Sequence, residues 1–197
     1  FSQGITRRGS YAAYLDISHP EVEEFLDIRK PTGGDINRKS TNLHHGVVIS
    51  DEFMQIIENA TRFEGYDDSW DLIDPHSGEV KKTVSAKTLW VKLIPNRVET
   101  GEPYIMFKDT IDEAMPAFQK RLGLEVHQSN LCSEITLPTD KDRTAVCCLS
   151  SVNLEEYDEW KYNDMFIPDL VRMLDNVLTY FIENSDPSLH RAAYSAM

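Results

Sequence analysis

The chain has 197 residues, 41% hydrophobic and 27% charged, a composition typical of a globular protein rather than a disordered one. Its formal net charge of −13 gives a field that repels nucleic acid, so we expect no nucleic-acid partner. No apolar run is long enough to cross a bilayer and the first residues lack the apolar core of a signal peptide, so we expect no membrane partner.

The first ten residues form a basic segment that leads into an apolar run. Gly4 and Gly9 would let the backbone approach a ligand closely. The guanidinium groups of Arg7 and Arg8 could bind a phosphate or stack on a base. A frayed chain end explains the same residues equally well.

Strand and helix patterns alternate along the rest of the chain. Residues rich in β-formers predict strands at 11–17, 46–49, 104–107, 134–137 and 145–149. Apolar residues at helical spacing predict a helix opened by Pro20, one at 51–60 capped by Ser50, one from Ser85 to about Val98, a short one at 113–122 and the longest at 165–184. Residues 61–83 predict an irregular excursion with a small β-element at 70–73. This alternation favours an α/β fold with a largely parallel sheet or barrel, in which chemistry sits on loops at strand ends.

The most informative stretch is SNLCSE at 129–134, which places an amide, a thiol and a carboxylate close together. A lone cysteine is most often a buried structural thiol, but only Leu131 in this loop is apolar, so we favour a functional role for Cys132. No neighbouring basic residue would stabilise its thiolate, and the carboxylate of Glu134 would disfavour it. The pairing suits chemistry in which the thiol gives up a hydrogen atom while the carboxylate handles a proton.

Two further cysteines, Cys147 and Cys148, lie in the apolar run 145–149. Adjacent residues of a strand point to opposite faces, so only one of the pair could meet Cys132 and the other is expected in the core. A disulfide between the two neighbours would strain the backbone. Three cysteines, two of them adjacent, do not make a secreted disulfide framework and fit a reducing cytosol, so we expect a cytoplasmic location.

Metal and protease sites are weaker interpretations of these residues. His127, Cys132 and Cys147, or the adjacent His44 and His45, have no recognised ligand spacing, so we expect no metal site. A cysteine protease needs a histidine oriented toward Cys132, and the sequence marks out none of its six histidines for that role.

The sequence SNLCSEI at 129–135 resembles the signature of the large catalytic subunit of class I ribonucleotide reductase. A second family element, a Cys-x-Leu before a run that ends in Asn-Leu, stands at 147–154. The resemblance also extends over 11–17, 19–26 and 100–109. It implies that 1–197 is an incomplete catalytic domain, part of a ten-stranded α/β barrel, with the cysteine on a central finger loop at 127–135.

The resemblance also implies roles for single residues. Cys132 would become a transient thiyl radical and take the 3′-hydrogen of a ribonucleotide, while Glu134 would accept the 3′-hydroxyl proton. Asn130 and Ser129 would bind the substrate together with Glu134. Cys147 would be one member of a redox pair that reduces the 2′ position and ends as a disulfide.

Residues 1–10 would form the specificity loop, which reports the bound effector nucleotide, a dNTP or ATP, to the substrate base. Gln3, Arg7 and Arg8 would be the contact residues of this loop. The implied partners are a metal-containing small subunit that supplies the radical, a second large subunit, thioredoxin or glutaredoxin as reductant, and missing segments of the same subunit. We expect no cofactor on this chain itself.

The chain also departs from the family. No cysteine precedes Cys132, whereas in the family the redox partner of Cys147 lies upstream. The family's tyrosine pair that passes the radical, its phosphate-binding turn and its reducing C-terminal cysteines are also not recognisable in this chain. The first residue is not Met and the last residues show no helix-stop signal, so we expect a piece of a longer protein that is inactive alone. An adenosylcobalamin-dependent reductase is the nearest alternative, although that group more often has Pro where Leu131 stands. A non-catalytic nucleotide-binding or assembly piece of a split subunit is the other.

Overall fold

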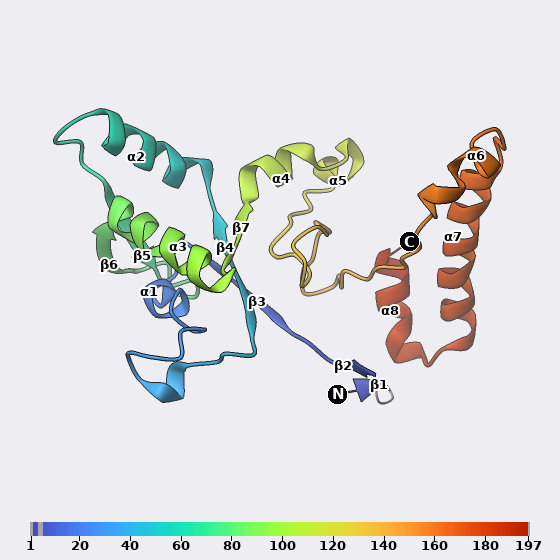
Figure 1. The fold of residues 1–197 in the computed structure, drawn as a ribbon, viewed down its shortest axis with the longest axis horizontal. Helices are drawn as coiled ribbons and strands as arrows, with labels where there is room; N and C mark the ends of the chain where they lie inside the picture. The colour runs from blue at the N-terminus through green and yellow to red at the C-terminus, as the bar shows by residue number, and fades with distance from the viewer. Residues whose placement is uncertain (1, 4–5, 197) are drawn as a thin grey trace. The chain divides into compact units, whose positions relative to one another are not determined.

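A computed structural model describes residues 2–3 and 6–196. The chain divides into two compact units, Phe1–Leu137 and Pro138–Met197. The first unit contains the strands and the helices between them, and the second contains an irregular segment followed by helices (Figure 1). The fold of the described residues is therefore mixed α/β, as the sequence predicts.

A three-stranded parallel sheet is the centre of the first unit (Figure 1). It contains β3 (Ala12–Asp16), β4 (His44–Ile49) and β7 (Tyr104–Phe107), with β4 in the middle. All three strands are predicted from the sequence, and the structure confirms them. Parallel strands need a crossover between them, and the helices predicted from the sequence provide it.

Helices and a hairpin fill the two crossovers. They are α1 (Val22–Phe25) and η1 (Ile36–Arg38) before β4, and α2 (Asp51–Arg62), β5 (Ser69–Ile73), β6 (Val80–Ser85) and α3 (Ala86–Thr100) after it. The hydroxyl oxygens of Ser50 and Ser85 accept the backbone N–H of the third helical residue at 3.2 and 3.0 Å, so both predicted N-caps are confirmed. The irregular excursion predicted at 61–83 contains the antiparallel β5–β6 hairpin, which is longer than the small β-element expected.

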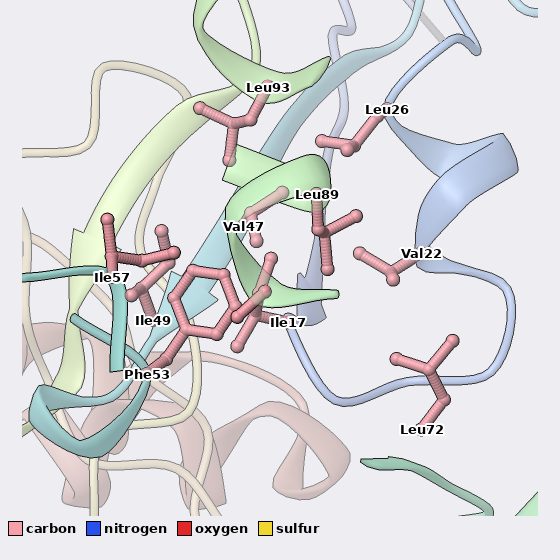
Figure 2. Close-up of a cluster of buried hydrophobic side chains, with 11 residues drawn as sticks. Ile17, Val22, Leu26, Val47, Ile49, Phe53, Ile57, Leu72, Leu89 and Leu93 are labelled. Carbon is pink, nitrogen blue, oxygen red and sulfur yellow. The ribbon is translucent and has the colours of Figure 1, made fainter. Parts of the chain in front are cut away.

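The main core lies on one face of the sheet. Its buried side chains are Ile17, Val22, Leu26, Val47, Ile49, Phe53, Ile57, Leu72, Ala86, Leu89 and Leu93 (Figure 2). The ring of Phe53 is fully buried and meets the ring of Trp70 edge-on, with 5.1 Å between the centroids. Because side chains alternate along a strand, Val47 and Ile49 of β4 face this core while Gly46 and Val48 face the other side.

A smaller core covers the opposite face of the sheet. Val48 and Met106 pack there with Met115 and Val126, and the ring of Tyr14 lies against them. The single helix predicted at 113–122 is instead two short helices, α4 (Lys108–Ala114) and α5 (Ala117–Arg121). Pro116 lies between them, where its missing N–H and extended backbone interrupt the helix.

The second unit is mainly a helical hairpin. It contains η2 (Leu154–Glu156), α6 (Tyr157–Trp160), α7 (Phe166–Asn184) and α8 (Pro187–Ala196), and α7 packs against α8. The long helix predicted at 165–184 is therefore confirmed. No helix in the described part of the chain is long and apolar enough to cross a membrane.

Two predicted strands are wrong. Residues 134–137 and 145–149 have no regular secondary structure. The described residues between α5 and η2 contain one isolated antiparallel bridge, between Asp140 and Arg143, and no strand that could pair with either segment. Alternating β-formers do not make a strand without a neighbour to accept their backbone hydrogen bonds.

Candidate functional site

The cysteine loop, residues 127–135, follows α5 without regular secondary structure. A turn at its centre is closed by the backbone N–H of Ser133, which donates to the carbonyl of Asn130 at 3.2 Å. Ser133 has a φ of +65°, a left-handed conformation that non-glycine residues seldom adopt. The side chains of Cys132 and Glu134, on either side of Ser133, are both exposed.

The side chain of Asn130 organises this loop. Its Oδ1 accepts the backbone N–H groups of Glu134 and Ile135, each at 3.2 Å. Its Nδ2 donates to Oε1 of Glu134 at 2.8 Å, a hydrogen bond to a charged group and therefore one of the stronger kind. Asn130 thus fixes both the backbone that follows the cysteine and the carboxylate beside it.

The hydroxyl of Ser129 closes the loop. It donates to the carbonyl of Ile135 at 2.6 Å and lies 3.3 Å from Oδ1 of Asn130. Three of the residues singled out from the sequence, Ser129, Asn130 and Glu134, therefore form one hydrogen-bonded cluster around Cys132.

Two tyrosines of the sheet lie beside the cysteine loop. The hydroxyl of Tyr14 in β3 donates to the backbone carbonyl of Asn130 at 2.8 Å. Burial raises the pKa of Tyr104 in β7, and negative charge on the nearby Glu102, or on Cys132 when it is ionised, raises it further. Tyr104 is therefore a neutral phenol at physiological pH. Neither tyrosine can be identified from the sequence, because the relation of each to the loop depends on contacts distant in sequence.

Cys147 and Cys148 lie in the second unit, and both are free thiols, like Cys132. Cys147 is exposed and Cys148 is half-buried. The expectation that one of them is a core residue is therefore wrong. Their segment is irregular rather than a strand, so the two side chains are not assigned to opposite faces of a sheet.

The first residues form a small antiparallel ladder of β1 (Ser2–Gln3) and β2 (Arg7–Arg8). Gln3 pairs with Arg7, so two of the predicted contact residues occupy matching positions on adjacent strands. The side chain of Arg8 is exposed. Residues 1, 4 and 5 of the predicted specificity loop, including Gly4, lie outside the described residues.

Asp109 follows β7 in the first turn of α4, and the end of a strand is where the predicted α/β fold would place chemistry. Its Oδ2 instead accepts the backbone N–H of Asp51 at 2.6 Å, at the start of α2. This carboxylate therefore caps a helix, alongside Ser50.

A buried carboxylate cluster is the main feature that the sequence analysis missed. Glu102, 5% exposed, is hydrogen-bonded to His44 and His45 at 2.5–3.1 Å and forms an ion pair with Arg29 at 3.4 Å. No short-range motif marks it, because its members come from three separate segments. Within residues 2–3 and 6–196, no group of three or more His, Cys, Asp or Glu side chains is arranged to hold a metal ion.

Comparison with known families identifies the class of this chain. Residues 1–197 match the family described as ribonucleotide reductase, barrel domain. The chain belongs to this family.

Individual relatives agree with that assignment. The chain is 46% identical to the ribonucleoside-diphosphate reductase large subunit of Invertebrate iridescent virus 3, over 100% of the chain and 38% of the relative. It is 33% identical to the large subunit of Arabidopsis thaliana, over 90% of the chain and 23% of the relative. It is 34% identical to the ribonucleoside-diphosphate reductase subunit alpha of Chlamydia muridarum, over 90% of the chain and 19% of the relative. The chain therefore spans well under half the length of these curated relatives.

Proposed function

We propose that the polypeptide carrying this chain is the catalytic large subunit of a ribonucleoside-diphosphate reductase and that Cys132 is its hydrogen-abstracting thiol. The observation that carries the proposal is the hydrogen bond from Asn130 Nδ2 to Glu134 Oε1, which holds a carboxylate two residues from an exposed cysteine. Relatives from a virus, a plant and a bacterium all carry the diphosphate reductase name, which favours this enzyme over an adenosylcobalamin-dependent one.

In this proposal the loop residues divide the first step between them. Cys132, as a thiyl radical, takes the 3′-hydrogen atom of the ribose and becomes a thiol. Glu134 accepts the 3′-hydroxyl proton, and its exposed side chain leaves the carboxylate open to that hydroxyl. Asn130 and Ser129 bind the substrate, while Asn130 also holds the Glu134 carboxylate and Ser129 holds the carbonyl of Ile135.

The reducing step needs two thiols. We assign one to Cys147, whose side chain is exposed. The 2′-hydroxyl leaves as water, the sugar carbon gains hydrogen, and the two thiols are oxidised to one disulfide, so that the two electrons balance. The family resemblance places the second thiol upstream of Cys132, and no cysteine precedes Cys132 in this sequence, so we assign the second thiol to a part of the polypeptide outside these 197 residues.

The wider assembly belongs to the same proposal. The three parallel strands are part of a ten-stranded barrel, with residues 127–135 as its finger loop. Residues 1–10 are the specificity loop, with Gln3, Arg7 and Arg8 as contacts for the effector-dependent signal. A metal-containing small subunit supplies the radical, a second large subunit completes a homodimer, and thioredoxin or glutaredoxin reduces the disulfide, in the cytoplasm.

The test is reduction of a ribonucleoside diphosphate by the whole polypeptide, mixed with its radical-generating subunit and a dithiol reductant. Cys132→Ser and Glu134→Gln should abolish product formation, while the matched control Cys148→Ser should leave it within about twofold, because no role is assigned to the half-buried Cys148 and serine is close to cysteine in size. Product formation by Cys132→Ser would contradict the proposal. The 197 residues alone should form no product, since they contain no thiol upstream of Cys132 and the radical-generating subunit is absent.

A further inference from the structure

The residues Tyr14, Gly46 and Tyr104 form one row across the parallel sheet. Tyr14 pairs with Gly46 in the register of β3 with β4, and Gly46 pairs with Tyr104 in the register of β4 with β7. The row lies on the face opposite the main core, since the ring of Tyr14 packs with the second cluster, around Val48 and Met106. The cysteine loop meets the sheet on this face.

Gly46 is the residue that makes room for Tyr14. A Cβ added to Gly46 would lie 2.4 and 2.7 Å from two carbons of the Tyr14 ring, closer than any real contact of this kind. One side of the Tyr14 ring therefore occupies the space that a side chain at position 46 would need. The φ of Gly46 is not in the left-handed region, so the backbone conformation does not require glycine at this position. Glycine is required because the Tyr14 ring leaves no room for a side chain.

The hydroxyl of Tyr14 donates a hydrogen bond to the backbone carbonyl of Asn130 in the cysteine loop. Its 2.8 Å hydrogen bond ends on the carbonyl oxygen of Asn130, which also accepts the backbone N–H of Ser133 at 3.2 Å. That second bond closes the turn that contains Cys132. One carbonyl oxygen therefore joins the turn to the parallel sheet, although residues 14 and 130 are 116 positions apart.

We propose that Tyr14 is a positioning residue, which fixes the height and orientation of the Cys132 turn above the sheet, and that Gly46 is required for this contact. The inference rests on the proposed function, in which the thiol must meet one hydrogen atom of the substrate. Hydrogen transfer depends on short, well-aligned approach, and a misplacement of about 1 Å can reduce a rate by roughly a hundredfold. Asn130, Ser129 and Glu134 hold the loop together internally, whereas Tyr14 holds the loop to the sheet.

Tyr14→Phe is the central test, since it removes only the hydroxyl and keeps the ring in its place. In the whole polypeptide, amide hydrogen exchange at Ser133, Glu134 and Ile135 should become at least about tenfold faster, because their acceptors lie on the released Asn130. With the radical-generating subunit present, kcat should fall roughly tenfold or more while KM stays within about twofold. The matched control Tyr11→Phe, at a tyrosine that is 63% exposed just before β3, should change neither quantity.

A double-mutant cycle separates this contact from general loss of stability. Gly46→Ala should accelerate exchange in the loop by displacing the Tyr14 ring. Adding Gly46→Ala to Tyr14→Phe should change loop exchange and kcat little further, because both substitutions break the same contact. Fully additive effects would show that the two residues act separately and would overturn the proposal.

The outcomes also distinguish this inference from the proposed function. Unchanged loop exchange in Tyr14→Phe would overturn the inference, whatever the enzyme does. Faster exchange with unchanged kcat would also overturn it, since the contact would then be structural only. Activity that survives in Cys132→Ser would overturn the proposed function itself, and loop exchange would still report whether Tyr14 fixes the loop.

Discussion

Glu102 binds His45 through two hydrogen bonds to the same carboxylate oxygen. Oε2 accepts the backbone N–H of His45 at 2.9 Å and lies 3.1 Å from its ring Nδ1. The second oxygen, Oε1, lies 2.5 Å from Nδ1 of His44 and 3.4 Å from Nη1 of Arg29. One buried carboxylate therefore fixes the first residues of β4 and links them to the segment that precedes β7 and to the loop after α1.

Removing this carboxylate should be strongly destabilising. Glu102→Ala leaves the Arg29 cation without its counter-charge and the backbone N–H of His45 without its acceptor, and breaking a buried ion pair typically costs about 3–5 kcal/mol. Urea unfolding followed by tryptophan fluorescence would measure the change. Glu99→Ala, at an exposed glutamate three residues earlier, should alter the free energy of unfolding by no more than about 0.5 kcal/mol. Equal effects of the two variants would show that the cluster contributes nothing specific.

The same cluster should make stability fall on acidification. Burial lowers the pKa of His45 below 6.5 and outweighs the opposite effect of Glu102, so at mildly acidic pH the unfolded chain binds a proton that the folded chain does not. Burial alone would raise the pKa of Glu102, but hydrogen bonds from His44 and His45, with the charge of Arg29, hold it below 4.5. Both pKa shifts therefore favour unfolding as the pH falls. The shift of His45 acts in the range just below pH 6.5, and the shift of Glu102 acts below about pH 4.5.

Melting temperatures between pH 7.5 and pH 5.5 would isolate the histidine. The wild-type value should fall over this range, and the fall should be smaller in His45→Gln, whose amide does not titrate. His76→Gln is the matched control, at an exposed histidine of the β5–β6 hairpin, and it should keep the wild-type slope. An unchanged slope in His45→Gln would refute the assignment.

Two substitutions of Asn130 should separate its hydrogen bonds to the loop backbone from its hydrogen bond to the Glu134 carboxylate. Asn130→Asp keeps the acceptor for the backbone N–H groups of Glu134 and Ile135, but it replaces the donor to Oε1 with a repelling carboxylate. Asn130→Ala removes all of these bonds. We expect amide exchange in the loop to stay slow in Asn130→Asp and to accelerate in Asn130→Ala, while nucleotide reduction falls roughly a hundredfold in both. Wild-type activity in Asn130→Asp would show that its hydrogen bond to Glu134 is dispensable.

The main core should depend heavily on Phe53. Its ring is fully buried between the sheet and the helices (Figure 2), so Phe53→Ala should cost about 3–5 kcal/mol through lost burial and the cavity left behind. The fluorescence of Trp70, which contacts the ring, gives a direct readout in chemical denaturation. Phe63→Ala is the control, since that ring is 60% exposed, and it should cost less than about 1 kcal/mol.

The elements that the sequence predicts well are those defined by local chemistry. Ser50 and Ser85 begin their helices because a hydroxyl that accepts a backbone N–H is a short-range signal. The cysteine loop is likewise polar and continuous in sequence, so its internal cluster of Ser129, Asn130 and Glu134 could be anticipated as a site.

The features that sequence reasoning misses depend on distant partners. The strands predicted at 134–137 and 145–149 fail because no neighbouring strand pairs with them among the described residues. The contact of Tyr14 with Asn130 and the contact of Glu102 with His45 join segments that are 116 and 57 positions apart. No periodicity or spacing encodes such pairs, because they arise only when the parallel register is formed.

The position of β4 at the centre of the sheet has a consequence for work with these 197 residues alone. Within the described residues, β3 and β7 each pair on one side, to β4, so each leaves an edge of backbone N–H and C=O groups facing outward. Unpaired edges are templates for association with other strands, and natural proteins cover or shorten them. The segment expressed by itself should therefore self-associate more readily than its net charge of −13 suggests, and the whole polypeptide, in which the proposed barrel would pair these edges, should self-associate less.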